Sequence, residues 1–321
     1  MTSITKVQLN APYLILIGDL KDITYAKTGS GIVHWRPELV AGQLRFEGCE
    51  VDLGVPDMTI AEAVDAGVRS LVIGVAPVGG VVPGNWWKSI EEAARAGLDI
   101  VCGLHFKLKD FPAVAEAARA SGARLIDVRT PPANLPVGNG KKRSGKRLLM
   151  VGTDCVSGKK YSALALTQCM QDAGMNATFR ATGQTGIMLA GEGIPIDAVV
   201  ADFVSGAAEI ISPDNEAHHW DVIEGQGALS HPGYSGVSLG LLHGSQPDAI
   251  VLCHDASRKV ISGWEHYELL SVQDTIEQNL LMGRRTNPDI RCVGISVNTS
   301  QLPANERENY LDSLSKKTGL P

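Results

Sequence analysis

The sequence predicts a two-domain α/β protein in which each domain is built on a parallel sheet. Short apolar runs alternate with helix-like stretches in both halves of the 321-residue chain. A segment rich in proline, glycine and basic residues, PPANLPVGNGKKRSGKR at 131–147, interrupts this alternation and is typical of a linker. In the second half, one apolar run leads into a glycine-bounded loop and then a helix. We therefore expect domains at 1–140 and 146–321.

The first domain begins with the apolar run YLILIG, and three similar runs follow it. Helices are expected at 85–97 and 110–122, each closed by a glycine at its C-terminal end. Apolar strands that alternate with helices are covered on both faces of a parallel sheet, so we predict a Rossmann-like domain. Its strands are expected at 13–18, 70–76, 99–104 and 123–128.

The second domain repeats this order of elements. A helix from about 158 to 173 is expected after the first strand. Ligands bind beyond the carboxyl ends of parallel strands, so the loops at those ends are the candidate site. The strands are expected at 147–152, 176–183, 220–225, 249–255 and 291–298.

Composition excludes several classes of protein. The 29 basic and 35 acidic residues give a net charge of −6, which argues against nucleic acid or an anionic membrane as a partner. No apolar run approaches the roughly 18 residues of a membrane span, and the N-terminus is typical of a first strand rather than a signal peptide. The six cysteines show no metal-finger spacing, so we expect a reduced, cytoplasmic protein.

The segment GTDCVSGKK has the composition of a phosphate-binding loop, which makes the second domain P-loop NTPase-like. Its glycines let backbone N–H groups turn inward, and a helix N-terminus and Lys159 add positive charge. Lys160 stands where such loops usually carry the Ser or Thr that holds Mg²⁺. The missing hydroxyl argues against ATP hydrolysis but not against binding of a pyrophosphate. The expected phosphate contacts are Gly152, Thr153, Asp154, Cys155, Ser157, Gly158, Lys159 and Lys160.

The loop resembles that of dethiobiotin synthetase and related P-loop amidoligases. Those proteins also carry E-G-x-G at the end of a later strand, as this chain does from Glu224 to Gly227. The resemblance implies a glutamate that helps to bind Mg²⁺ near the transferred phosphate. It supports an alternative function, an ATP- and Mg²⁺-dependent ligase or kinase acting on a small carboxylic acid.

A second resemblance covers nearly the whole chain. The motifs IGVAPVGGVVPGNW, GTDCxxGK, TGQTG, DFVSGAAE, EGQGALSHP and LCHDASR occur together in this order. The chain is thereby similar to the bacterial D-glutamate N-acetyltransferase family. The resemblance implies acetyl transfer from acetyl-CoA to the amine of D-glutamate, a homodimer, and an N-acetyl-D-glutamate racemase as pathway partner. Coenzyme A carries a pyrophosphate, so a phosphate loop can anchor it without Mg²⁺. A non-catalytic sensor of nucleotide or CoA is a third alternative.

Attack on a thioester requires a general base to take a proton from the ammonium group of the acceptor. The candidates stand at strand ends of the second domain: Glu224, His231, Asp255 and Asp202, with His254 as an alternative to Asp255. Cys155, inside the loop, is a candidate covalent acetyl carrier or a small residue packed beneath the phosphates.

An acidic substrate requires cations, and Arg36 and Lys107 are the candidates in the first domain. The loop GVAPVGGVVPG lacks a titratable group, so Gly79 and Gly80 are expected to offer backbone N–H donors. Trp86 and Trp87, just after this loop, either line a pocket or fasten a helix, and the second role is favoured. No HExxH motif occurs, and no metal is expected.

Overall fold

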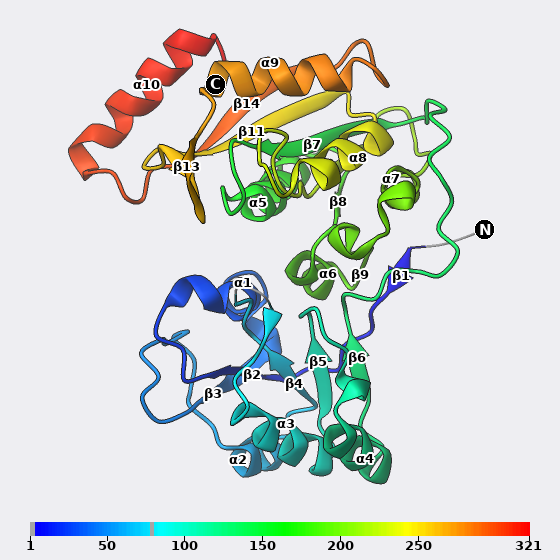
Figure 1. The fold of residues 1–321 in the computed structure, drawn as a ribbon, viewed down its shortest axis with the longest axis vertical. Helices are drawn as coiled ribbons and strands as arrows, with labels where there is room; N and C mark the ends of the chain where they lie inside the picture. The colour runs from blue at the N-terminus through cyan, green and yellow to red at the C-terminus, as the bar shows by residue number, and fades with distance from the viewer. Residues whose placement is uncertain (1–3, 78–79) are drawn as a thin grey trace. The chain divides into compact units, whose positions relative to one another are not determined.

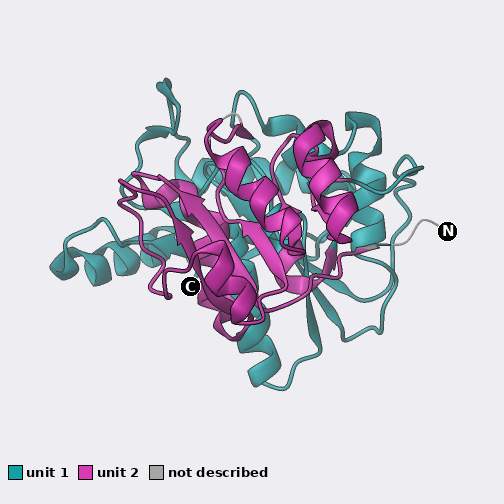
Figure 2. Ribbon diagram, turned by 90° about the horizontal axis from the view of Figure 1, so that it is seen from below, with its two compact units in different colours: residues 1–5, 131–186, 193–321 teal, residues 6–130, 187–192 magenta. Residues whose placement is uncertain are grey.

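The computed structural model describes residues 4–77 and 80–321 (Figure 1). The chain forms two compact units, coloured separately in Figure 2. The C-terminal unit contains residues 4–5, 131–186 and 193–321, and the N-terminal unit contains 6–130 and 187–192. Each unit has its own five-stranded sheet, and the prediction of two α/β units with parallel sheets is confirmed.

The sheet of the N-terminal unit is covered on both faces. Helix α1 lies on one side of the sheet, and α2, α3 and α4 lie together on the other side (Figure 1). The helices are α1 (Lys27–Trp35), α2 (Ile60–Asp65), α3 (Trp86–Arg95) and α4 (Pro112–Ser121). Across the sheet the strands run β3 (Val40–Arg45), β2 (Tyr13–Gly18), β4 (Ser70–Ile73), β5 (Asp99–Cys102) and β6 (Leu125–Asp127). The four predicted strands and the two predicted helices of this unit are all present, and Gly122 ends α4 in the left-handed conformation.

The edge strand β3 was not predicted from the sequence. Its sequence, VAGQLR, contains no continuous apolar run, and the search for strands relied on such runs. Gln43 is buried in the middle of β3, where its side-chain amide donates hydrogen bonds to Asp52 Oδ1 (2.8 Å) and the Val55 carbonyl oxygen (2.9 Å). This polar residue can be buried on an edge strand because neighbouring loop groups form hydrogen bonds with its side chain.

The sheet of the C-terminal unit has β7 at its centre. Its helices are α5 (Lys159–Asp172), α7 (Val204–Ile211), α8 (Ser235–Ser245), α9 (Val272–Gly283) and α10 (Arg307–Thr318). Across the sheet the strands run β8 (Ala177–Arg180), β10 (Trp220–Ile223), β7 (Lys146–Gly152), β11 (Ala249–Asp255) and β14 (Arg291–Asn298). All five predicted strands and the helix after the first of them are present.

Alternate residues of β7 point into two hydrophobic clusters. Leu149 and Val151 pack with residues of α7 and α8 on one face of the sheet. Leu148 and Met150 pack with residues of α5, including Ala163, on the other face. Because both faces of the sheet are covered, a ligand can approach at its edge, where the strands end.

The remaining elements are short. Strand β1 (Thr5–Lys6) pairs with β9 (Glu192–Gly193), and β12 (Val260–Ile261) pairs antiparallel with β13 (Trp264–Glu268). Helix α6 spans Gln184–Ala190. Turns of 3-10 helix occur at Ile23–Ala26, Pro37–Leu39, Leu108–Asp110, Ile196–Ala198, Ala201–Phe203 and Ala304–Glu306.

The segment that connects the two sheets, predicted as a linker, packs on the C-terminal unit. Glu209 of α7 accepts hydrogen bonds from the backbone N–H groups of Asn139 and Gly140, both at 2.9 Å. The guanidinium of Arg143 donates to the carbonyl oxygens of Ser212 (2.7 Å) and Gly244 (2.8 Å). These contacts fix the chain as it enters the central strand β7.

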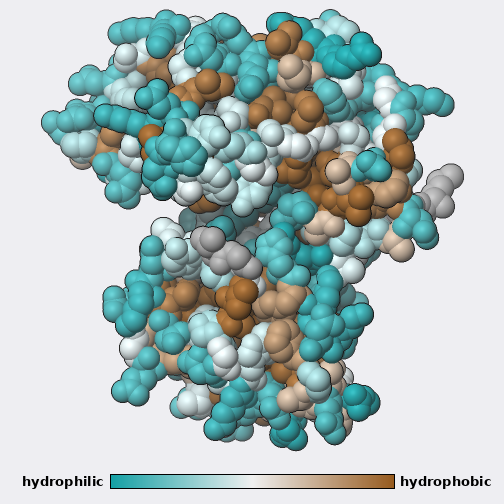
Figure 3. All heavy atoms as spheres, viewed as in Figure 1, coloured by the Kyte–Doolittle hydropathy of each residue, from teal (hydrophilic) through white to brown (hydrophobic). Residues whose placement is uncertain are grey.

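Within the described residues, no helix has both the length and the apolar character needed to cross a bilayer. On the face shown in Figure 3, the region of α10 is largely hydrophilic. This agrees with the sequence of α10, RENYLDSLSKKT, in which no residue is buried.

The two adjacent tryptophans at the start of α3 fasten that helix to its own unit, as the sequence analysis favours. Trp86 is fully buried, its Nε1–H donates to Asp19 Oδ1 (2.8 Å), and its ring meets Phe46 edge-on. Trp87 stacks on Phe111, which directly precedes α4. Both rings therefore hold α3 against neighbouring segments of the N-terminal unit.

Replacing Trp86 by alanine is expected to lower the free energy of unfolding by about 3–5 kcal/mol, because it leaves a large cavity and removes the Asp19 hydrogen bond. Denaturant unfolding measures this change. Val81→Ala is the matched control, since Val81 is 72% exposed and its loss should cost little. Equal stabilities for the two variants would contradict the fastening role of Trp86.

Candidate phosphate-binding site

Three neighbouring strands end at the same edge of the C-terminal sheet. Strand β7 lies between β10 and β11, and all three are parallel. Gly152 ends β7 and opens the phosphate loop, Glu224 directly follows β10, and Asp255 ends β11. The sheet order therefore brings together three of the motifs that the sequence analysis singled out.

The backbone of the loop from Gly152 to Lys159 is tightly turned. Gly158 has φ +96°, and Val156 has φ +53° with 63% of its surface exposed. A Cβ on Gly152 would stand only 2.6 Å from Ser157 Oγ and 2.9 Å from Lys159 Nζ. Only glycine therefore fits at the start of this turn.

The turned backbone presents several N–H groups to one place. Among the described residues, no hydrogen-bond acceptor is seen for the backbone N–H groups of Val156, Gly158 and Lys159. They lie at the N-terminus of α5, where the helix dipole adds partial positive charge. Consecutive N–H donors at a helix N-terminus are the usual backbone ligands of a phosphate group.

Lys159 supplies a full positive charge beneath the loop. It is buried, and its Nζ donates hydrogen bonds to the Asp154 carbonyl oxygen (2.8 Å) and Ser157 Oγ (3.3 Å). Burial lowers the pKa of Lys159, and the negative charge of a Cys155 thiolate acts in the opposite direction. A bound anion would favour the charged form of Lys159 in the same way.

Arg258 holds the outer side of the loop, and sequence reasoning did not single it out. Its Nη1 donates to Asp154 Oδ2 (3.0 Å) and to the Cys155 carbonyl oxygen (2.7 Å), and its Nη2 donates to the Val156 carbonyl oxygen (3.3 Å). Two carbonyl oxygens of the loop are thus bound by one guanidinium group. The signal was present in the motif LCHDASR, where Arg258 follows the strand end at Asp255 by three residues.

Asp255 is occupied by structural contacts. Its Oδ1 accepts from Ser257 N (3.0 Å) and Ser257 Oγ (2.6 Å), and its Oδ2 accepts from Asn298 Nδ2 (3.2 Å). Burial raises the pKa of Asp255, but the Ser257 hydrogen bonds and the charge of Arg258 outweigh it and lower the pKa overall. A carboxylate held in this way is a weak proton acceptor.

His254 bridges the loop to α10. Its Nδ1 lies 3.1 Å from Thr153 Oγ1, and its Nε2 lies 3.0 Å from the Tyr310 hydroxyl. Burial lowers the pKa of His254, which favours the neutral ring. Both ring nitrogens are therefore engaged in fixing the start of the phosphate loop.

Glu224 is a buried carboxyl group at the end of β10. Its Oε2 accepts from the backbone N–H groups of Thr182 and Gly183, both at 2.9 Å. Burial raises the pKa of Glu224, while the Thr182 hydrogen bond and the charge of Lys160 act to lower it. A Cβ on Gly186 would stand 2.3 Å from Oε2, so the TGQTG segment is shaped around this carboxyl. Glu224 is thus a buried carboxyl group on which the charge of Lys160 acts.

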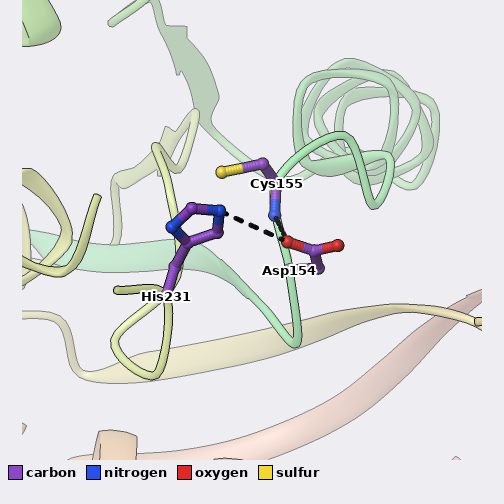
Figure 4. Close-up of side chains that lie close together, drawn as sticks. All are labelled: Asp154, Cys155 and His231. Atoms are coloured by element: carbon purple, nitrogen blue, oxygen red, sulfur yellow. Dashed lines mark hydrogen bonds and ion pairs between the residues drawn. The ribbon is translucent and has the colours of Figure 1, made fainter. Parts of the chain in front are cut away.

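His231, Asp154 and Cys155 form a cluster against the loop (Figure 4). One ligand atom from each side chain lies within 4.8 Å of the other two. His231 Nδ1 accepts a hydrogen bond from Gly233 N (3.0 Å), so the ring proton resides on Nε2, the nitrogen that faces Asp154 Oδ1 at 3.9 Å. Asp154 Oδ1 also accepts from Cys155 N (2.6 Å). A metal ion would require a lone pair on Nε2, so these donors fit a metal poorly.

The other predicted site residues have their own surroundings. Asp202 is exposed in a 3-10 turn before α7, and no contact with the loop is seen among the described residues. Arg36 pairs with Glu38 at 2.5 Å in the N-terminal unit. Lys107 Nζ, in the same unit, donates to Thr130 Oγ1 (2.7 Å).

The two glycines proposed as substrate donors also belong to the N-terminal unit. Gly80 has φ +68°, and a Cβ there would lie 2.5 Å from His105 Cδ2. Its N–H donates to the Pro77 carbonyl oxygen at 3.0 Å. Gly79 lies outside the described residues.

The fold and the loop define a two-domain protein with a phosphate-loop domain at its C-terminus. Residues 136–321 match a domain of unknown function described as the DUF1611_C P-loop domain. Residues 44–131 match the DUF1611_N Rossmann-like domain. The chain therefore belongs to the DUF1611 family, and the predicted Rossmann-like and P-loop domains are confirmed.

Similar proteins cover almost the whole chain. Two curated relatives named D-glutamate N-acetyltransferase are each 46% identical to it, one from Tritonibacter scottomollicae over 313 residues and one from Pseudoalteromonas sp over 315 residues. The alignments cover 98% of this chain and 94% and 95% of the relatives. A crystal structure of a DUF1611 family protein from Anabaena variabilis has a TM-score of 0.87 at 31% identity, covering 97% of this chain and 94% of that one. The family resemblance inferred from the motifs is confirmed.

Lys159→Met is expected to weaken pyrophosphate binding at least tenfold, because a charge-assisted hydrogen bond contributes about 1.5–3 kcal/mol. The free energy of unfolding should fall by at most about 1–3 kcal/mol, because the Asp154 carbonyl oxygen and Ser157 Oγ lose their hydrogen bonds from Lys159. Calorimetric titration with pyrophosphate and denaturant unfolding measure the two effects. Lys146→Met, at the opposite end of β7, is the control. Unchanged affinity in Lys159→Met would contradict the phosphate site.

Proposed function

We propose that this protein is an N-acetyltransferase that moves the acetyl group of acetyl-CoA to the amino group of D-glutamate. The observation that carries the proposal is the 46% identity, over 98% of the chain, to two curated relatives named D-glutamate N-acetyltransferase. The acetyl-CoA donor is inferred from the loop, because coenzyme A contains a diphosphate that such a loop can bind.

The architecture of the loop supports an anchor that works without metal. Backbone N–H groups at the start of α5 and the buried ammonium of Lys159 are ligands suited to a diphosphate. Acetyl transfer breaks no phosphate bond, so it has no need of the hydroxyl that Lys160 replaces. The charge of Lys160 acts on Glu224. In the nucleotide-dependent proteins with a similar loop, the glutamate of the matching E-G-x-G motif helps to bind Mg²⁺.

The proposal extends to the setting of the enzyme. All six cysteines are free, which suits the reducing cytoplasm. We infer a homodimer, and a racemase that consumes the N-acetyl-D-glutamate product. The acceptor amine must lose a proton before or during attack, and Glu224 is the buried proton acceptor best placed at a strand end.

A ligase or kinase that uses ATP and Mg²⁺ is the second candidate, favoured by the EGQG motif after β10. Lys160 argues against it, because the Mg²⁺-binding hydroxyl of the loop is missing.

The test is release of free thiol from acetyl-CoA with D-glutamate, L-glutamate or no acceptor, each in EDTA and in Mg-ATP. We expect release that depends on D-glutamate and is unaffected by EDTA. ATP turnover that EDTA abolishes, without thiol release, would contradict the transferase and support the ligase or kinase.

Glu224→Gln is expected to lower kcat by about 10²–10⁴-fold if Glu224 is the general base, because glutamine keeps the shape but accepts no proton. The KM for acetyl-CoA should change little. Steady-state kinetics at several pH values measure both constants, and Asp202→Asn, on the exposed turn, is the comparison. Wild-type kcat in Glu224→Gln would exclude Glu224 as the base.

A further inference from the structure

His231 has an unused hydrogen-bond donor inside the protein. The residue is 1% exposed, and its Nε2 has no hydrogen-bond partner among the described residues. A buried polar group without a partner costs free energy of folding, so it usually has one in the functional state.

The local backbone determines what this nitrogen can do. Gly233 N donates to Nδ1 at 3.0 Å, which leaves the proton of the neutral ring on Nε2. Tyr234 and Trp264 pack on the ring, with centroids 4.6 and 4.8 Å from its centroid. Nε2 therefore offers a hydrogen atom in a fixed direction and has no lone pair with which to accept a proton.

The donor is aimed at the phosphate loop, as Figure 4 shows. Nε2 lies 3.9 Å from Asp154 Oδ1, and a ring nitrogen of His231 lies within 4.8 Å of Cys155 Sγ. The charge of Lys159 also acts on the ring. Asp154 is already bound by Arg258 Nη1 (3.0 Å), Ser262 N (3.0 Å) and Cys155 N (2.6 Å). Since Nε2 and Asp154 Oδ1 are too far apart for a hydrogen bond, a bound ligand can supply the acceptor that Nε2–H lacks.

In acetyl-CoA, a long pantetheine arm lies between the diphosphate and the thioester that reacts. This step rests on the proposed function. The pantetheine arm between the diphosphate and the thioester spans roughly 15 Å when extended, at about 3.5 Å for every three chain bonds. A diphosphate seated on the loop therefore allows the thioester to lie up to about that distance from the loop, so a residue that binds the diphosphate need not take part in acetyl transfer.

We propose that His231 is a ligand of the bound diphosphate, to which it donates a hydrogen bond from Nε2. It is a binding residue for coenzyme A and takes no proton from the acceptor amine. The same site also accepts inorganic pyrophosphate, which shares the chemistry of the anchor.

The experiment compares the full-length protein with His231→Ala and His231→Gln, because a glutamine amide N–H can replace the Nε2–H donor but cannot act as a base. Pyrophosphate affinity is measured by calorimetry in EDTA. The KM for acetyl-CoA and kcat are measured by thiol release with D-glutamate. His219→Gln is the matched control, since His219 is also buried, has an Nε2 without a hydrogen bond, and precedes the opposite end of β10.

We expect His231→Ala to weaken pyrophosphate binding and raise the KM for acetyl-CoA about tenfold, with kcat within about twofold of wild type. His231→Gln should recover most of the affinity, and His219→Gln should match wild type. Thermal unfolding checks that each variant is folded.

Wild-type pyrophosphate affinity in both His231 variants, or no binding by the wild type, would overturn the inference. So would a kcat loss of about 10²-fold or more in both variants, because that is the signature of a base. Zinc binding that His231→Ala abolishes would instead assign the cluster to a metal. If the wild type releases no thiol, the proposed function fails, while the pyrophosphate comparison still tests His231.

Discussion

The phosphate loop depends on cations that hold its carbonyl oxygens to one side. Arg258 binds the carbonyl oxygens of Cys155 and Val156, and Lys159 binds that of Asp154. Since the C=O and N–H groups of one peptide unit point in opposite directions, binding these carbonyl oxygens also fixes the directions of N–H groups in the loop, which can then bind an anion. The position of Arg258 depends in turn on β11, which places it beside the central strand.

The sheet order explains why residues far apart in sequence share this site. Glu224 and Asp255 follow the two strands that flank β7, so their loops meet the phosphate loop at the same edge. Their environments nevertheless differ. Asp255 is bound by Ser257 and Asn298 and has a lowered pKa, whereas burial raises the pKa of Glu224. Of two carboxyl groups at the ends of neighbouring strands, Asp255 is thereby held in structural contacts, and Glu224 is the proposed general base.

Much of the fold could be predicted because buried parallel strands are continuous apolar runs, as in YLILIG and AIVLCHD. Strand β3 could not be predicted, because it buries the polar residue Gln43. Its side-chain amide forms hydrogen bonds with Asp52 and Val55, and no local sequence pattern indicates these contacts. The loop and Glu224 were recognised from their motifs, but the role of Arg258 depends on contacts with residues about 100 positions earlier in the chain. The ring proton of His231 likewise depends on the turn to Gly233, which is visible only in three dimensions.

Lys160 stands where phosphate loops usually carry a Mg²⁺-binding hydroxyl, and this replacement is consistent with a loop that binds phosphates without reacting with them. In a phosphoryl-transfer enzyme the loop hydroxyl and the strand-end glutamate must share a metal ion beside the reacting phosphate. In the proposed acetyl transfer the phosphates only hold the cofactor, and the bond that breaks lies at the far end of its arm. A lysine at this position then leaves the proposed reaction unaffected, because acetyl transfer does not use the Mg²⁺-binding hydroxyl. Its charge acts on Glu224, where a metal ion would otherwise act. The anchor of such an enzyme needs a fixed array of donors and charge, which the loop, Lys159 and His231 supply together.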